Sequence, residues 1–249
     1  MSVSSFYDSL APWYDVVYGD WQGSIERQAD ALMSILLEER GTKPQRILDA
    51  AVGVGTQALG LAARGWAMIG ADISLIAVRR AMTEAHGRSV KIPCVVSDMR
   101  ALPVRSHSFD TVISCDNALP HLLDEHQIGI ALSEFRRCLR DGGTCLLSLR
   151  DYAPPPEDGT VETKDYGRRL WRGRPCRLQQ VWRWRGHHYD VLFEIFATDS
   201  PGERLATTPE TTYFAIPVER VLALMRAAGF RSVQRVSGRF FQPVLVGTR

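Results

Sequence analysis

The spacing of apolar residues changes repeatedly along the first 150 positions. From Gln22 to Arg40 apolar side chains recur every three or four residues, which predicts an amphipathic helix that ends at Gly41. Short apolar runs typical of buried strands then alternate with helical patterns. The strands are expected at 46–50, 67–71, 93–97, 109–115 and 144–150, and the helices at about 56–65, 75–86 and 125–140. This alternation predicts an α/β fold with a doubly wound, mostly parallel, Rossmann-like sheet.

After residue 151 the pattern becomes one of antiparallel strands. Pro154–Pro156 end the regular structure, and two alternating runs, Leu178–Trp184 and Tyr189–Ala197, predict a hairpin with one apolar face. Arg204–Phe214 is expected to add one more strand, and a helix from Pro217 to Gly229 then precedes two closing strands at 231–237 and 242–247. We therefore divide the chain into an N-terminal helical segment with the core (1–150), an antiparallel insertion (151–212) and the end of the core (213–249).

The composition is that of an ordinary globular protein. Of 249 residues 45% are hydrophobic and 23% charged, and a net charge of +2 without a basic block argues against a nucleic-acid partner. Five cysteines without a C-x-x-C pair indicate a reduced, cytoplasmic setting. We see no signal peptide and no apolar run of the ~20 residues that span a membrane. His187 and His188 lack an acid or cysteine at ligand spacing, so no metal site is predicted.

The most informative segment is the turn that follows the first expected strand. The strand ends at Asp49, and Gly53 and Gly55 follow before the next helix, in a G-x-G-x-x-A spacing typical of nucleotide-binding turns. Asp72 closes the second strand. Because an acid at position 49 would repel a pyrophosphate, the turn favours a sulfonium cofactor without phosphates, S-adenosylmethionine (SAM), over a dinucleotide. The competing roles are structural: Asp72 as a helix cap, and Asp49 and Asp98 as turn residues.

In these motifs the chain resembles the class I SAM-dependent methyltransferases, over residues 6–150 and 213–249. Asp49–Thr56 is similar to the family motif D-x-[GA]-x-G-x-G, Asp72 matches the acid that binds the ribose, and Ser97–Met99 matches the adenine segment. The tyrosine-rich segment 6–18 resembles the family's entry that folds over the cofactor. The cofactor residues implied are Tyr14, Asp49, Ala51, Gly53, Gly55, Asp72, Ile73, Asp98, Met99 and Cys115.

Two further segments are similar to glycine and sarcosine N-methyltransferases. Residues 115–122 resemble G-N-S-x-x-H-L, and 148–152 resemble a segment whose arginine binds the substrate carboxylate. The resemblance implies an antiparallel lid at 151–212. It implies catalytic roles for Asn117, His121 and Arg150, and substrate contacts from Tyr18, Asn117, Arg150 and Tyr213.

The alternatives for these residues remain structural. They are an ion pair of Arg150 with Asp151 or another acid, a turn role for Asn117 and a packing role for His121. Two positions depart from the pattern: Asp116 replaces the glycine, and Ser24 stands where an arginine is expected. An additional carboxylate beside the amine site would suit a cationic substrate.

The expected function is methylation of the nitrogen of a small amine or amino acid, with a glycine/sarcosine-like or amino-sugar-like acceptor. The alternatives are O- or C-methylation of a small molecule and a catalytically silent SAM-binding module. A homo-oligomer is compatible with the sequence. Methyl transfer to nitrogen requires no metal and depends mainly on orienting the amine, which can contribute about 7–11 kcal/mol.

Overall fold

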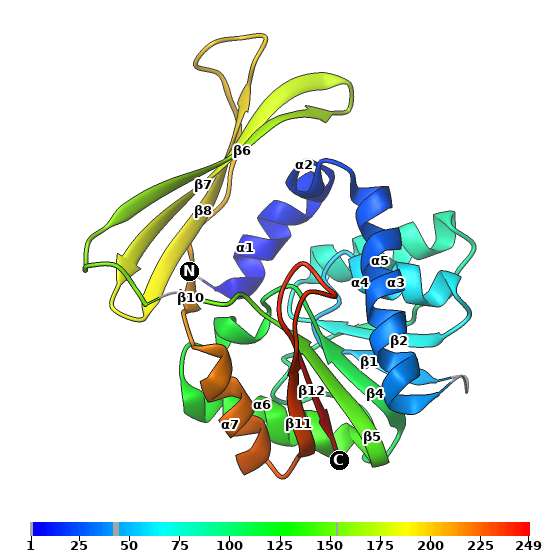
Figure 1. The fold of residues 1–249 in the computed structure, drawn as a ribbon. Coiled ribbons are helices and arrows are strands. Elements are labelled where there is room, and N and C mark those ends of the chain that lie inside the picture. Colours follow the sequence, from blue (N-terminus) through cyan, green and yellow to red (C-terminus); the bar gives the residue numbers. More distant parts are fainter. Residues whose placement is uncertain (1, 42–44, 153) are drawn as a thin grey trace.

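The computed structural model describes residues 2–41, 45–152 and 154–249, and its larger sheet has seven strands in the order β11-β12-β5-β4-β1-β2-β3 (Figure 1). The five neighbouring strands β5, β4, β1, β2 and β3 are parallel to one another, whereas β12 is antiparallel to β5 and to β11. The predicted α/β fold class is therefore confirmed. The strands are β1 (Arg46–Asp49), β2 (Ala67–Asp72), β3 (Cys94–Val96), β4 (Phe109–Ser114), β5 (Leu139–Ser148), β11 (Arg231–Val236) and β12 (Val244–Thr248).

Helices cover both faces of this sheet because successive strand residues point to opposite sides. Ile47 packs in one buried cluster with α3 (Trp21–Arg40), α4 (Thr56–Ala63) and α5 (Leu75–Gly87). Leu48, the next residue, packs in a second cluster with α6 (Glu125–Cys138) and α7 (Val218–Ala227). The two cores hold the parallel strands in place, and their carboxyl ends form a common edge.

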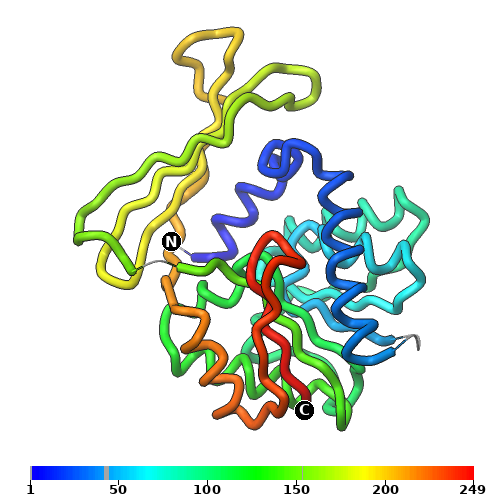
Figure 2. Tube along the Cα trace, viewed as in Figure 1, coloured from blue at the N-terminus to red at the C-terminus, as the bar shows by residue number. Residues whose placement is uncertain are grey.

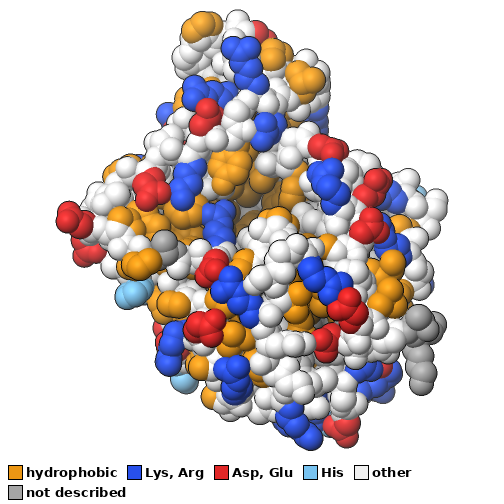
Figure 3. All heavy atoms as spheres, viewed as in Figure 1, with side chains coloured by type: hydrophobic (Ala, Val, Ile, Leu, Met, Phe, Trp, Pro, Cys, Tyr) orange, Lys and Arg blue, Asp and Glu red, His pale blue; other side chains and the backbone are white. Residues whose placement is uncertain are grey.

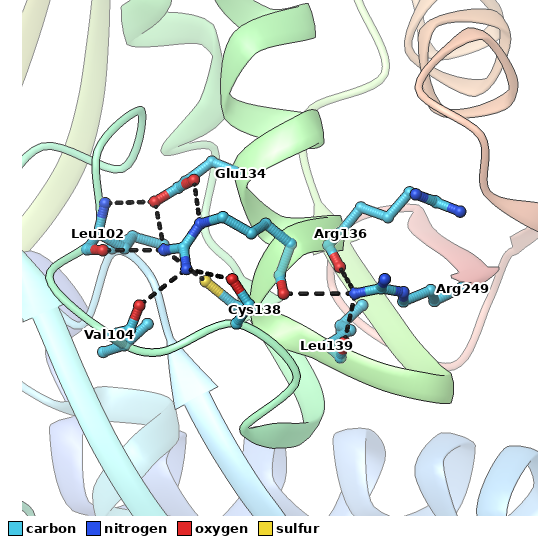
Figure 4. A network of polar contacts seen from close by, with 9 residues as sticks. Leu102, Val104, Glu134, Arg136, Cys138, Leu139 and Arg249 are labelled. Carbon is cyan, nitrogen blue, oxygen red and sulfur yellow. Dashed lines mark hydrogen bonds and ion pairs between the residues drawn. The ribbon is translucent and has the colours of Figure 1, made fainter.

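A polar network anchors the segment that follows β3 to α6 (Figure 4). Glu134 accepts a hydrogen bond from the backbone N of Leu102 at 2.7 Å and pairs with Arg137, which donates to the carbonyls of Leu102 and Val104 at 3.0 and 2.8 Å. Arg249 donates to carbonyls at the end of α6, including that of Leu139 at 2.7 Å. Helix α6 ends at Cys138, two residues before its predicted end, because β5 already begins at Leu139.

The insertion forms a separate five-stranded antiparallel sheet, which we call the lid sheet. Its order is β10-β8-β7-β6, and β9 pairs with β8. The predicted hairpin is confirmed as β7 and β8, but the single strand expected at 204–214 is divided into two strands, which both pair with β8 and are separated by residues 208–210. The lid strands are β6 (Val161–Trp171), β7 (Arg174–Arg185), β8 (His188–Ala197), β9 (Arg204–Thr207) and β10 (Thr211–Phe214). The boundary placed at 212 therefore falls inside β10.

The N-terminal segment packs between the lid sheet and the core (Figure 2). It consists of α1 (Val3–Leu10), a 3₁₀ turn and α2 (Tyr14–Tyr18). Phe6 and Val16 are buried in one cluster with Trp182 and Tyr189 of the lid sheet. On the core side, Asp8 accepts a hydrogen bond from Ser74 at the start of α5, at 2.6 Å. Within the described ranges no helix is long and apolar enough to cross a membrane.

Candidate cofactor and acceptor site

A cavity opens at the carboxyl ends of β1, β2 and β4, beneath α1 and α2. Its empty space, the mouth included, is about 830 Å³, within the range of small-ligand sites. This edge of the sheet is where open α/β folds bind their ligands. Of the residues predicted from the sequence, the cavity brings together Tyr14, Tyr18, Ala51, Gly53, Asp72, Ile73, Asp98, Met99, Cys115 and His121. Asp49, Gly55, Asn117, Arg150 and Tyr213 are not among its lining residues.

Asp72 joins the end of β2 to the glycine turn. Its Oδ2 accepts from the backbone N of Gly53 at 2.8 Å and its Oδ1 from that of Ser74 at 2.9 Å. Asp72 is not the residue that caps α5. The cap is Ser74, whose side chain accepts a hydrogen bond from the backbone N of Ala77. Burial raises the pKa of Asp72, and the two backbone donors oppose this rise. Each oxygen keeps a second lone pair, which suits the two hydroxyls of a ribose.

The glycine turn presents bare backbone to the cavity. Gly53 has φ +52° and Gly55 has φ +96°, and a Cβ on Gly53 would meet no protein atom within 4 Å. The backbone N of Ala51 is used by Asp49, and that of Gly53 is used by Asp72. The carbonyl oxygens of Ala51 and Gly53 accept no hydrogen bond from any described residue. These free acceptors suit a ligand ammonium group.

Asp49 lies beneath the glycine turn and is not among the residues that line the cavity. In this position it supports the backbone of the turn, whereas the sequence analysis placed it among the cofactor-binding residues. The residue is 1% exposed, its Oδ1 accepts from the N of Ala51, and its Oδ2 has no partner among the described residues. Burial raises the pKa of this carboxyl to about 7. An acid under the turn is compatible with the cationic methionine end of SAM and unfavourable to a pyrophosphate. The residues present therefore fit SAM.

The carboxylate of Asp98 is held in place by Arg100, a residue to which the sequence analysis assigned no role. Arg100 donates to Asp98 Oδ1 from its backbone N at 2.8 Å and from Nε at 3.0 Å. This pairing lowers the pKa of Asp98 and keeps the carboxylate charged. Asp98, Met99 and Arg100 all line the cavity, so the acid expected to contact adenine shares one space with Asp72.

His121 links the cavity wall to α1 and to the lid sheet. Its Nδ1 donates to the carbonyl of Thr212 at 3.2 Å, so its Nε2 accepts from the hydroxyl of Tyr7 at 2.8 Å. Tyr213 in turn donates to Tyr7 at 3.2 Å. Burial lowers the pKa of His121 to about 4, which keeps the ring neutral. Because both ring nitrogens are occupied, the structure favours the packing role over that of a base.

The side-chain amide of Asn117 forms hydrogen bonds within the protein through both its oxygen and its nitrogen. Its Oδ1 accepts from the backbone N of Arg150 at 3.0 Å, and its Nδ2 donates to the hydroxyl of Tyr152 at 2.8 Å. Its own backbone N donates to the carbonyl of Ser148 at 3.0 Å. Asn117 thus ties the end of β4 to the end of β5, which makes it a positioning residue here.

Arg150 faces a second hollow, which we call the lid crevice. The alternative ion pair with Asp151 is not formed, because Asp151 pairs with Arg235. The Arg150 guanidinium lies over the ring of Trp182, 4.7 Å from its centroid, without an ion pair or hydrogen bond to the described residues. Lining residues of the lid crevice include Arg150, Tyr152, Lys164, Trp182, Trp184 and Phe241.

The lid crevice is rich in hydrogen-bond donors. Lys164 lies 3.5 Å from the Trp182 centroid and is paired with Glu162, while the buried indole N–H of Trp184 lacks a partner among the described residues. Figure 3 shows hydrophobic side chains in the hollowed face between the lid sheet and the core, with Lys and Arg side chains beside them. The lining also includes the carboxylates of Glu162 and Asp151, which pair with Lys164 and Arg235. Arg150 is thus the lining cation that has no ion pair among the described residues, and its guanidinium suits an anionic group.

Several cavity residues were missed by the sequence analysis. Tyr7 stands in the same tyrosine-rich segment as Tyr14 and Tyr18, so its signal is present in the sequence. Thr56 and Gln57 also line the cavity, and Thr56 accepts from the indole N–H of Trp21 at 2.9 Å. Both lie in the segment of the glycine motif, but the contacts of their side chains with Trp21 and Gln28 of α3 could not be predicted from the local sequence.

The fold and the cavity together define a nucleoside-cofactor-binding α/β domain. Residues 47–143 match a family described as "Methyltransferase domain". This match and the similar proteins support assignment to the class I SAM-dependent methyltransferases, the family that the sequence resembled and whose cofactor is SAM.

Individual relatives agree with this assignment. The glycine/sarcosine N-methyltransferase of Parasynechococcus marenigrum (strain WH8102) is 30% identical over 149 residues, which are 59% of this chain and 52% of that protein. The chain thus spans about half the length of the curated relatives it matches. Among solved structures, the CcbJ methyltransferase from Streptomyces caelestis has a TM-score of 0.79 at 16% identity and covers 100% of this chain and 98% of its own. SAM-bound CalS10, an amino pentose methyltransferase from Micromonospora echinaspora, has a TM-score of 0.75 at 18% identity, with 95% and 96% covered.

Proposed function

We propose that this protein uses SAM to methylate the nitrogen of a small amine or amino acid. The observation that carries the proposal is one enclosed cavity. It combines a ribose acid (Asp72), a bare glycine turn (Gly53) and, on the acceptor side, tyrosines with the carboxylate of Asp116. Relatives named glycine/sarcosine N-methyltransferases, and the sugar N-methyltransferase KedS8 among solved structures of the same fold, support the choice of nitrogen.

Each part of the cavity has a role in this proposal. When bound, SAM supplies a methyl group on a sulfonium, whose loss leaves a neutral thioether. Asp72 would hold the ribose, Asp98 and Met99 the adenine, and the free carbonyls of Ala51 and Gly53 the methionine ammonium. Tyrosine rings over the cavity favour a cationic sulfonium and exclude water. The lid sheet and the N-terminal segment would keep the amine in line with the methyl group.

The acceptor's other end is proposed to bind in the lid crevice. The guanidinium of Arg150 is largely enclosed by aromatic side chains and has no acidic partner among the described residues. A partly buried cation that forms no ion pair is costly, so an anionic group on the acceptor would be stabilised there. This supports the carboxylate role that the family resemblance implies for Arg150.

Replacing Arg150 with alanine is expected to raise the KM of an anionic acceptor by about tenfold or more, the loss of one charge-assisted contact. The SAM dissociation constant should change by less than about twofold, because Arg150 is not in the wall of the cofactor cavity. Steady-state kinetics and calorimetry measure the two quantities. Arg168→Ala, on the exposed face of β6, is the control. An equal loss of affinity for both ligands would refute the anion-binding role.

Titration calorimetry with SAM and with NADH tests the cofactor assignment directly. We expect saturable SAM binding and no NADH binding, and tight NADH binding would overturn the proposal. A methyl-transfer screen over amino acids, amino sugars and phenols then tests the acceptor. Methylated phenols would establish the O- or C-methyltransferase alternative, and SAM binding without any transfer would indicate the silent module.

A further inference from the structure

Asp116 is placed at the cavity by an unusual backbone. It follows β4 with φ +57°, and Asn117 follows with φ +66°. Both lie in the left-handed region, which Asp and Asn adopt more readily than other non-glycine residues and which recurs at functional sites. The backbone N of Asp116 donates to the hydroxyl of Ser148 at 2.8 Å, and Ser148 donates to Gln242 at 3.1 Å. The surrounding contacts thus fix the strained residue so that it lines the cavity.

The carboxylate of Asp116 is only half satisfied. Its Oδ2 accepts from the hydroxyl of Tyr18 at 2.7 Å, whereas its Oδ1 accepts no hydrogen bond from the described residues. No described cation forms an ion pair with it, although the guanidinium of Arg150 is close enough to lower its pKa. A largely enclosed carboxylate that has one free oxygen and no ion pair among the described residues can bind a cationic group from outside the protein.

We propose that Asp116 binds the ammonium form of the acceptor and accepts its proton before methyl transfer. The inference rests on the proposed function and deepens it: the acceptor is a primary or secondary amine that arrives protonated. With Arg150 at its other end, such an acceptor is zwitterionic. In the proposed step an N–H bond of the ammonium breaks, an O–H bond forms on Oδ1, and the electron pair stays on nitrogen. That pair is then free to take the methyl group, and the proton leaves Asp116 for water when the cavity opens.

The electrostatics suit this proton transfer. Burial raises the pKa of Asp116, which makes its carboxyl a better proton acceptor than an exposed aspartate. Burial also raises the pKa of each surrounding tyrosine and of the neighbouring thiol, so they stay neutral, whereas Arg150 stays charged. The titratable and charged groups that face Asp116 are Tyr7 on α1, Tyr14 and Tyr18 on α2, Cys115, Arg150 after β5 and Tyr213 on β10.

Carboxyl NMR with methylammonium as the probe tests the binding half of the proposal. The protein is labelled with ¹³C in aspartate carboxyls and loaded with S-adenosylhomocysteine, and Asp116→Asn assigns the signal. We expect methylammonium chloride to shift the Asp116 signal saturably and to lower its apparent pKa, since a bound cation favours the carboxylate. Sodium chloride at equal ionic strength should do neither. An Asp116 signal that responds equally to both salts would overturn the inference.

Kinetics test the proton-transfer half. With an amine from the acceptor screen, Asp116→Asn should lower kcat/KM by about a hundredfold or more, since a general base contributes about 10²–10⁴-fold. The SAM dissociation constant should stay within about twofold. The control is Asp141→Asn, which removes a carboxylate whose side chain is 91% exposed. Unchanged kcat/KM would refute the proton transfer. A variant that loses SAM but not S-adenosylhomocysteine affinity would assign Asp116 to the sulfonium instead. Absence of SAM binding in the unmodified protein would be a failure of the proposed function, not of this inference.

Discussion

Replacing Asp72 with asparagine is expected to weaken SAM binding by about a hundredfold or more. Its two oxygens hold the turn through the N of Gly53 and the start of α5 through the N of Ser74, and they offer their remaining lone pairs to the cavity. Each hydrogen bond to a charged acceptor contributes about 1.5–3 kcal/mol, and two of them to the ribose account for a change of this size. The amide would also place a donor opposite a backbone N–H.

Calorimetry measures this loss, and thermal unfolding without SAM shows whether the variant folds. Asp141→Asn, remote from the cavity and highly exposed, should bind SAM as the unmodified protein does. If a folded Asp72→Asn variant bound SAM within about threefold of the original affinity, the ribose role would be wrong.

Replacing Gly60 with alanine is expected to lower the free energy of unfolding by about 2 kcal/mol, in the range measured for overpacked cores. Gly60 is where α4 crosses α3, and a Cβ there would lie 2.5 Å from the Cβ of Ala29 and 2.6 Å from the carbonyl oxygen of Ile25. The backbone contact cannot be relieved by a side-chain rotation, so the helices must separate. For a chain of this size the melting temperature should fall by about 4–8 °C.

Gly129 in α6 provides a matched control, because a Cβ there would meet no atom within 4 Å. Gly129→Ala should raise the free energy of unfolding by about 0.5–1 kcal/mol through helix propensity alone. Chemical denaturation measures both variants. Equal stability of the two alanine variants would show that α3 and α4 tolerate a wider separation than their packing suggests.

The core could be predicted from the sequence because its elements have strong periodicity. β4, for example, lies in the sheet centre and carries the buried apolar residues Phe109, Val112 and Ile113, and the glycine turn is a local motif. β6 was missed because it is an edge strand of the lid sheet without a buried residue. Its less exposed positions include the polar residues Glu162 and Lys164, so its sequence lacks the apolar alternation seen in β7. The division of 204–214 depends on pairing with β8, which no local pattern shows.

The cofactor-binding and acceptor-binding parts of the site also differ in how far they could be predicted from the sequence. The cofactor half lies on strand ends and a turn, so Gly53, Asp72 and Asp98 could be placed in one cavity from the sequence. The acceptor half depends on contacts between distant segments. The partner of His121 is 114 residues away in α1, and Asp151 pairs with Arg235 rather than with Arg150. Sequence spacing could name these residues but not their partners.

The Tyr7–His121–Tyr213 chain of hydrogen bonds connects the elements that cover the cavity, so the cover and the floor of the site are separate parts of the protein. It fastens three elements, α1, the turn after β4 and β10, over a pocket whose floor belongs to the sheet. Under the proposed function, substitutions in the elements that cover the cavity can therefore change which acceptor enters it, while the strand–turn–helix floor continues to bind the cofactor. New specificities can arise by replacing side chains of residues 3–18 and of the lid sheet, without rebuilding the domain underneath.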